Sequence, residues 1–254
     1  MAMLIGGAPR LSGDQLVDLL TLTEHVDRIT VKTSVPDTLR RSSLDTLGLD
    51  PLDARVREVY FFDTRDLRLN ARGLVLRAAR RPGKPDSLAV RLRPVDPSTL
   101  SPDIRRSPRF AVEIEAAPAG FVCSASVTAL PTKAVVNDVA RRGAPVSRLF
   151  SREQREVLAG RLPRGVALDD LAALGPIVVL RVRCPPTAAC RRLAAELWLY
   201  PDDHRIVELI ARCAPGDAFR AAAEVRELLA AAGLDPLAAP PAADQPPPAL
   251  RPAV

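Results

Sequence analysis

Cationic side chains alternate with aliphatic ones in the segment SLAVRLRP, residues 87–94, where Arg91 and Arg93 stand beside Val90 and Leu92. Successive side chains of an extended chain point to opposite sides, so the two arginines share one face of a predicted strand. A guanidinium group presents a planar fork of N–H donors that matches the oxygens of a carboxylate or a phosphate. The segment therefore predicts anion binding, provided that other strands bring cations to the same side.

The same alternation recurs along the chain, with acidic as well as basic residues on the charged faces. The candidate cations are Lys32, Arg77, Arg91, Arg93, Arg181 and Arg183. The candidate acids are Glu113, Glu115, Glu196 and Glu208. One strand of this kind usually turns its charges to water. Repetition over several strands instead favours a shared charged surface.

Alternation of period two predicts strands at residues 28–35, 54–64, 73–81, 87–94, 107–118, 176–184, 195–200 and 205–213. Helices are predicted at residues 13–23, 133–143, 151–162 and 217–234, and a helical turn within residues 36–48. Ser151 and Gln154 have the spacing of a capping box. The last helix is expected to begin at Asp217 as its N-cap and to end at Gly233.

The arrangement of these elements follows from what each surface needs. Helices require an apolar surface to pack on, and the aliphatic faces of the strands provide one. If helices cover those faces, the charged faces line either an open sheet surface or the interior of a closed barrel. Closure also removes sheet edges that invite aggregation. Charges inside a barrel need water, ion pairs, a metal or an anionic ligand, because an unpaired buried charge is very costly.

Composition narrows the class of protein. The chain has 254 residues, 47% of them hydrophobic, and a formal charge of +6, with a pI near 9.7. This balance suggests an anionic partner but does not locate its site. Four cysteines without CxxC spacing and two histidines argue against a zinc site or a disulfide framework and favour reduced thiols in the cytoplasm. We expect neither a signal peptide nor a membrane partner, because no apolar stretch approaches the roughly 18 residues that span a bilayer.

Three parts of the chain differ in character. Residues 1–25 are expected to be a helical extension, and residues 26–235 a single domain. Residues 236–254 are rich in proline and alanine and hold few large apolar side chains, so we expect a disordered tail. The oligomeric state and the role of the tail are left open by the sequence.

Residues 60–94, YFFDTRDLRLNARGLVLRAARRPGKPDSLAVRLRP, resemble the central signature of the CYTH superfamily, the triphosphate tunnel enzymes. A Tyr/Phe-Asp-Thr turn is followed there by a leucine-arginine strand and a basic hairpin partner. The segments FAVEIEA, SREQREVL, VVLRVRC and RIVELIARC come in an order similar to that of later family elements. The likeness extends over roughly residues 26–235.

The resemblance implies an α+β fold in which helices pack outside a closed or nearly closed, eight-stranded antiparallel β-barrel, the tunnel. It implies that the tunnel binds a triphosphate-containing small molecule or polyphosphate, through the six candidate cations given above. It also implies that glutamates hold Mg²⁺ or Mn²⁺, with Glu113, Glu115, Glu196 and Glu208 as ligands and Glu113 and Glu115 also catalytic. Family members hydrolyse inorganic, thiamine or nucleoside triphosphates, and some form cyclic AMP.

The chain departs from the family pattern mainly at metal ligands. Arg28 and Thr30 stand where the first strand usually carries two glutamates, and only Lys32 of that motif matches. Mg²⁺ prefers hard oxygen ligands, and a neighbouring cation opposes its binding. Ile210 stands where a second acid is expected after Glu208. We therefore expect this chain to retain anion binding even where catalysis is weakened or lost.

The strand at residues 73–81 departs from the pattern at a basic position. Ala79 replaces an inward basic residue, unless a bulge brings Arg80 round.

Three functions follow from these observations. The first is triphosphate or polyphosphate binding with catalysis weakened or lost. The second is an active metal-dependent triphosphatase or adenylate cyclase. The third is a basic β protein that binds nucleic acid, and the absence of a recognition motif and the scarcity of aromatic residues argue against it.

Several of the candidates also have purely structural explanations. Glu113 and Glu115 are able to form ion pairs with Arg77 or Arg91 and serve only to hold the sheet. Asp63 is expected to shape a turn, because an Asp-Thr pair readily bonds nearby backbone. Arg181 and Arg183 could lie on a solvated face, Trp198 and Tyr200 are expected to pack in a core or at a tunnel rim, and His204 is expected to be exposed.

Overall fold

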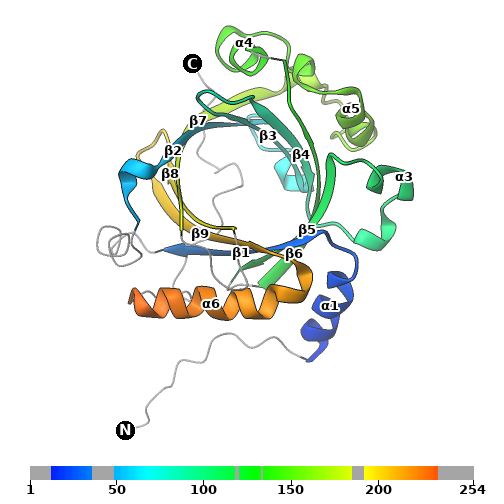
Figure 1. Ribbon diagram of the computed structural model, residues 1–254. Coiled ribbons are helices and arrows are strands. Elements are labelled where there is room, and N and C mark those ends of the chain that lie inside the picture. Colours follow the sequence, from blue (N-terminus) through cyan, green and yellow to red (C-terminus); the bar gives the residue numbers. More distant parts are fainter. Residues whose placement is uncertain (1–12, 36–48, 118–119, 133, 185–191, 234–254) are drawn as a thin grey trace.

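Nine strands close into a barrel in the computed structural model, which describes residues 13–35, 49–117, 120–132, 134–184 and 192–233 (Figure 1). Around the ring their order is β1-β5-β6-β4-β3-β2-β7-β8-β9. The strands are β1 Arg28–Val35, β2 Arg55–Asp63, β3 Leu74–Arg80, β4 Ser87–Leu92, β5 Phe110–Ala117, β6 Gly120–Ala129, β7 Ala172–Arg183, β8 Arg192–Leu199 and β9 Arg205–Cys213. The predicted closed barrel is confirmed.

The strand count and one pairing differ from the sequence prediction. The ring has nine strands where eight were expected, and β1 runs parallel to β5 while every other neighbouring pair is antiparallel. The unpredicted strand is β6. Its inward side chains include Ser124 and Ser126, opposite Glu113 and Ala111 of β5, so it lacks the charged face by which its neighbours were found.

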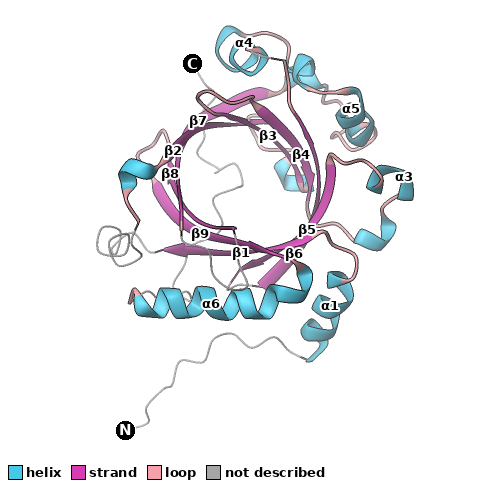
Figure 2. Cartoon of the chain, in the orientation of Figure 1, coloured by secondary structure: helices cyan, strands magenta, loops and turns pink. Residues whose placement is uncertain are grey.

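Helices lie outside the ring of strands (Figure 2). Their bounds are α1 Gly13–Thr23, α3 Pro102–Arg105, α4 Val135–Arg142, α5 Arg152–Leu158 and α6 Ala218–Ala231. α6 packs along β1 and β9, whereas α5 contacts β4 and β6. No helix in the described parts of the chain is long and apolar enough to cross a membrane.

Two apolar clusters fill the space between strands and helices. One joins Ile29 and Val31 of β1 to Val225 and Leu229 of α6. The other joins the outer faces of β2, β3 and β4 to α4 and α5. Because strand side chains alternate, Thr30 and Lys32 between the outer residues of β1 face the interior. The predicted division, aliphatic outside and charged inside, is confirmed on this strand.

A buried glutamine ties α5 to the barrel. The Gln154 side-chain amide donates to the carbonyl oxygens of Leu88 at 3.0 Å and Val127 at 3.1 Å, on adjacent strands. The predicted capping box is present, because Ser151 and Gln154 exchange side-chain to backbone hydrogen bonds. Asp217 is the N-cap of α6 as predicted, but its side chain makes no capping bond and pairs with Arg220 instead.

A third apolar cluster lies inside the barrel, where the sequence predicted charge. Phe61 sits between Tyr60 and Phe62, which belong to the outer core, so its own side chain points inward. The inner cluster consists of Val59, Phe61, Val75, Leu174, Ile177, Val179, Trp198 and Tyr200. These residues come from β2, β3 and β7, and from β8 and its end, so one wall of the interior is packed rather than hydrated.

The turn after β2 forms as predicted around Asp63. Its buried carboxylate accepts backbone hydrogen bonds from Thr64 at 2.7 Å and from Leu69 and Asn70 at 2.9 Å each. The chain then reaches Gly73, whose backbone is left-handed. The described cysteines, Cys123, Cys184 and Cys213, form no disulfide with one another. Cys190, residues 36–48 and the tail lie outside the described residues.

Gly73 permits a close approach of two chain segments. Its φ is 71°, and a Cβ added there would lie 1.7 Å from the carbonyl oxygen of Arg93. We expect Gly73→Ala to lower the free energy of unfolding by clearly more than Gly83→Ala, measured by urea denaturation. Gly83 is the matched control because its φ is 67° with nothing within 4 Å of the added atom, so it carries only the left-handed strain of about 1–2 kcal/mol. Equal losses in the two variants would contradict the proposed clash.

Candidate functional site

Two glutamates of β5 are held by two cations of β1, by one of β4 and by one that directly follows β4. Glu113 Oε2 is 2.6 Å from Arg28 Nε, and Glu113 Oε1 is 3.1 Å from Arg91 Nη2. Glu115 Oε2 is 3.2 Å from Lys32 Nζ and 3.0 Å from Arg93 Nη1, and Oε1 is 2.5 Å from Arg91 Nη1. Arg91 thus bridges both carboxylates. We call these six residues, Arg28, Lys32, Arg91, Arg93, Glu113 and Glu115, the β5 cluster.

Neighbouring charge decides the ionisation of Glu113. Burial raises the pKa of this carboxyl, but the guanidinium groups of Arg91 and Arg28 outweigh that effect, so the pKa lies below its usual value. A buried carboxylate with this surrounding is ionised at neutral pH. It acts as a fixed anchor that orients Arg91.

A second group gathers around Glu196 on β8. Its carboxylate pairs with Arg181 of β7, and Arg57 Nη1 lies 3.6 Å from Oε1. Burial raises the pKa of Glu196, but Arg181, Arg77 and Arg57 together hold it below its usual value. The guanidinium carbon of Arg77 also lies 5.3 Å from the centre of the Trp198 ring, within cation-π range. We call Arg57, Arg77, Arg181 and Glu196 the β8 cluster.

Burial beside other cations lowers the pKa of two interior arginines. Burial lowers the pKa of Arg57 to about 10; Glu196 opposes this change, while Arg181 and Arg77 add to it. Burial also lowers the pKa of Arg212 on β9, which feels Glu113 and Arg28 of the β5 cluster as well as Arg181 and Glu196. Arg212 therefore links the two clusters into one interior field in which cations outnumber carboxylates.

The structure brings most of the predicted site residues together. Lys32, Arg91, Arg93, Glu113 and Glu115 meet in the β5 cluster, and Arg77, Arg181 and Glu196 in the β8 cluster. Glu208 is buried opposite Glu196. Arg183, at the end of β7, is exposed.

The alternative that involved Arg80 is settled by its contacts. Ala79 keeps the inward position, while Arg80 points outward and binds Glu58 at 2.8 Å. The explanation in which Arg91 pairs with Glu113 and Glu115 also agrees with the contacts above.

Sequence reasoning missed three interior cations. Arg28 was recognised only as the loss of a carboxylate, although it now pairs with Glu113. Arg57 was hidden because β2 begins RVRE, with charge on both faces. Arg212 shares the inward face of β9 with Glu208, and this period-two spacing was the signal that could have found it.

The carboxylates do not fit a divalent metal site. Among the described residues, no group of three His, Cys, Asp or Glu is placed to hold a metal ion. The oxygens of Glu113 and Glu115 point to guanidinium and ammonium groups at the distances given above. The positive charge of Arg28 beside Glu113 would also repel a divalent metal ion. The expectation of Mg²⁺ or Mn²⁺ at these four glutamates therefore lacks a suitable donor set.

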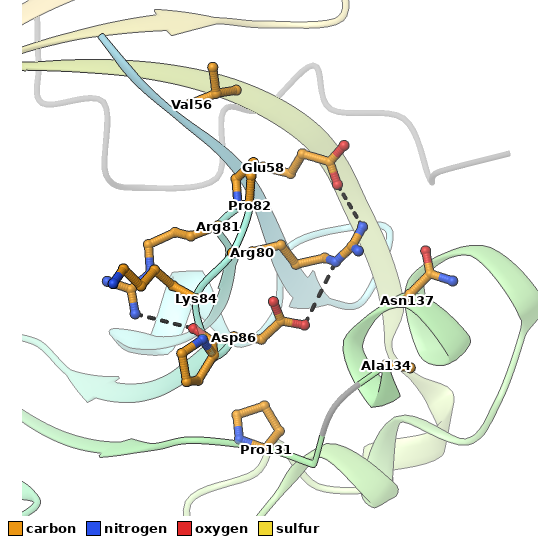
Figure 3. A pocket seen from close by; sticks show the side chains of 12 residues that line it. Val56, Glu58, Arg80, Arg81, Pro82, Lys84, Asp86, Pro131, Ala134 and Asn137 are labelled. Carbon is orange, nitrogen blue, oxygen red and sulfur yellow. Dashed lines mark hydrogen bonds and ion pairs between the residues drawn. The ribbon is translucent and has the colours of Figure 1, made fainter. Parts of the chain in front are cut away.

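A surface cavity of about 850 Å³ lies outside the barrel, between the β3–β4 hairpin and α4 (Figure 3). Its charged lining is largely paired internally: Arg80 contacts Glu58 at 2.8 Å and Asp86 at 3.7 Å, and Arg81 donates to the Pro85 carbonyl. The cavity lining holds three cations against two carboxylates, whereas the β5 cluster holds four cations against two and the β8 cluster three against one, so the interior has the larger surplus of positive charge. The interior is therefore the candidate functional site.

Comparison with solved structures agrees with the closed-barrel fold. A candidate adenylate cyclase from Bacillus halodurans matches with a TM-score of 0.60 and 13% identity, over 87% of this chain and 95% of that one. A candidate adenylyl cyclase from Hippeastrum, described with a dominant triphosphatase activity, matches with a TM-score of 0.57 and 17% identity, over 84% and 92%. Both are of the CYTH adenylate cyclase and triphosphatase fold. This chain has the CYTH fold.

Among the comparisons with known proteins, those of structure alone support the CYTH likeness. No protein-family model matches the sequence, and no curated protein matches it in a sequence comparison. In a closed barrel, inward side chains from every strand face a shared interior. What this chain does there has to follow from its own interior residues.

The pairing of Glu113 predicts a pH-dependent stability. A carboxyl whose pKa is depressed by folding stabilises the native state above its unfolded pKa of about 4.3, and that contribution is lost as the pH falls through the lower folded value. We expect Glu113→Gln to reduce the free energy of unfolding by about 2 kcal/mol at pH 7. The difference from the native protein should shrink steadily below the ordinary glutamate pKa, as followed by urea denaturation.

Glu156→Gln is the matched control for this measurement. Glu156 forms an exposed i,i+4 pair with Arg152, and such pairs contribute about 0.5 kcal/mol or less. A loss in Glu113→Gln that equals this control, or that does not change in acid, would show that the β5 cluster is not an ionised buried network.

Proposed function

We propose that the barrel binds a triphosphate or polyphosphate group through its interior arginines, and that metal-dependent turnover is weakened or lost. Unsatisfied buried donors carry the proposal. Within the described residues, Thr30 Oγ1, Ser124 Oγ and Arg57 Nε are buried without a hydrogen-bond partner. Leaving such groups unpaired is costly. Phosphate oxygens are acceptors that would satisfy all three.

The positions of these donors support a single ligand site. Thr30 is opposite Glu115 across the β1–β5 pair, and Ser124 is opposite Glu113 across β5–β6. Arg57 belongs to the β8 cluster. The donors therefore border both charged clusters, which Arg212 connects.

Electrostatics supports an anion of high charge. Burial among other cations disfavours the charged form of Arg57, and a bound polyanion would relieve that repulsion. The glutamates, in turn, fix the directions of Arg91 and Arg181 through ion pairs. Their role on this proposal is to orient phosphate ligands, while no step of catalysis is assigned to them.

Enclosure distinguishes this proposal from nucleic-acid binding. The surplus cations line the inside of a closed barrel, whereas proteins that bind single strands use a groove with aromatic stacking platforms. A binder of long nucleic acids should prefer long strands to short triphosphates, and competition between the two separates the functions.

We expect inorganic triphosphate to bind the native protein equally well in Mg²⁺ and in EDTA, measured by titration calorimetry. Arg57→Gln should weaken binding about tenfold without loss of stability, since its charge is disfavoured in the fold. Arg152→Gln, an exposed position on α5, is the matched control and should bind as the native protein does.

Phosphate release from inorganic triphosphate, ATP and thiamine triphosphate, with Mg²⁺ or Mn²⁺, tests the loss of turnover. We expect none above the background of heat-treated protein. Metal-dependent release that disappears in Glu113→Gln would instead establish the active triphosphatase. Absence of triphosphate binding in both metal and EDTA would overturn the proposed function.

A further inference from the structure

We propose that the interior is closed at one end and receives an oligophosphate end-on, so that it recognises the free end of a linear chain and does not thread a long one. This inference rests on the proposed function and adds the class of ligand. It follows from how exposure and polarity change along the inward faces of the strands.

The inward face of β7 passes from charged and open to apolar and closed. Arg183 at its end is exposed, and the Arg181 side chain retains 12% of its accessible surface. Val179 and Ile177, next along the same face, are 0% exposed. A residue that faces a water-filled channel cannot be fully buried. This part of the interior is therefore filled.

The adjoining strand β2 shows the same gradient. Arg55 is exposed and the Arg57 side chain is 24% exposed, but Val59 and Phe61 are buried. In the ladder Arg55 is opposite Arg181, and Val59 is opposite Ile177. The change from arginine to apolar packing thus occurs at matching places on neighbouring strands. Trp198 of β8 extends this apolar floor opposite Val179.

The opposite wall becomes buried in the same direction along its strand. The Arg28 side chain, at the start of β1, is 40% exposed, whereas that of Lys32 is 8% exposed and is paired with Glu115. Arg93 shares the same carboxylate at 3.0 Å. Deep in the barrel, apolar packing on one wall thus faces a buried ion-pair network on the other.

This geometry selects the shape of the ligand. Arginines at the open end can surround the terminal phosphates of a linear chain, while the buried apolar packing of the floor leaves no open path for a continuing anionic chain. Cyclic trimetaphosphate has the same elements as a triphosphate but no chain end. A long polyphosphate has many phosphates but few ends.

Trp198 supplies an internal reporter of where a ligand lies. It is the chain's one tryptophan, it is buried, and the Arg77 guanidinium lies 5.3 Å from its ring. A phosphate that engages Arg77 changes the field at the indole, so its fluorescence should respond. Binding confined to the outer surface should leave the emission unchanged.

The test compares four probes on the full chain: linear triphosphate, cyclic trimetaphosphate, long polyphosphate with free ends, and the same polyphosphate with both ends blocked as phosphoramidates. Calorimetry and Trp198 fluorescence follow each titration. We expect the cyclic and blocked probes to bind at least about tenfold more weakly than their linear or free-ended counterparts. Long free-ended chains should saturate at no more than one protein per chain end.

Arg57→Gln distinguishes the interior from the surface and should weaken the free-ended probes alike. End-on binding is overturned if blocked polyphosphate binds as tightly as free-ended polyphosphate and the number of proteins bound per chain grows with chain length. Binding of linear triphosphate would in that case still support the proposed function. Failure of linear triphosphate to bind overturns both. Residual binding of long chains in Arg57→Gln, without a change in Trp198 emission, identifies surface binding and also counts against the inference.

Discussion

Compensation of buried charge by ion pairing is the constraint on which this barrel depends. Glu113 and Glu115 sit in an enclosed interior where an unpaired carboxylate would cost several kcal/mol. Arg91 contacts both of them from a strand that is not adjacent to theirs. Each ion pair therefore fixes a distance across the interior as well as a charge. The wall and the site are built from the same contacts.

Replacement of a carboxylate by Arg28 changes what the interior can hold. A divalent cation brings its own charge and needs free carboxylate oxygens around it. Here guanidinium groups contact those oxygens and provide the positive charge themselves. Unlike a metal ion, they are covalently fixed and cannot dissociate. The likeness of fold to proteins described as cyclases or as having triphosphatase activity thus does not carry the chemistry with it.

The sequence allowed much of this fold to be predicted, because period-two alternation reports which face a strand buries. It located the β5 glutamates and Arg91 on the inward side. It failed at β6, because the inward residues Ser124 and Ser126 carry no charge. It also failed at the inner apolar cluster, because Phe61 lies in an unbroken run of apolar residues, which does not indicate the face to which each side chain points. It named Arg91 as an ion-pair partner of these glutamates but not Arg28, which lies 85 positions from Glu113.

The parallel placement of β1 beside β5 has a consequence for how the chain folds during synthesis. β1 is hydrogen-bonded to β5 on one side and to β9 on the other. The ring cannot close until β9 has emerged from the ribosome. Until then, the edge of β1 that pairs with β9 has no partner strand. Contacts between such distant segments fold slowly, and an unpaired strand edge is prone to association meanwhile. The same closure that protects the finished barrel makes its assembly the vulnerable stage.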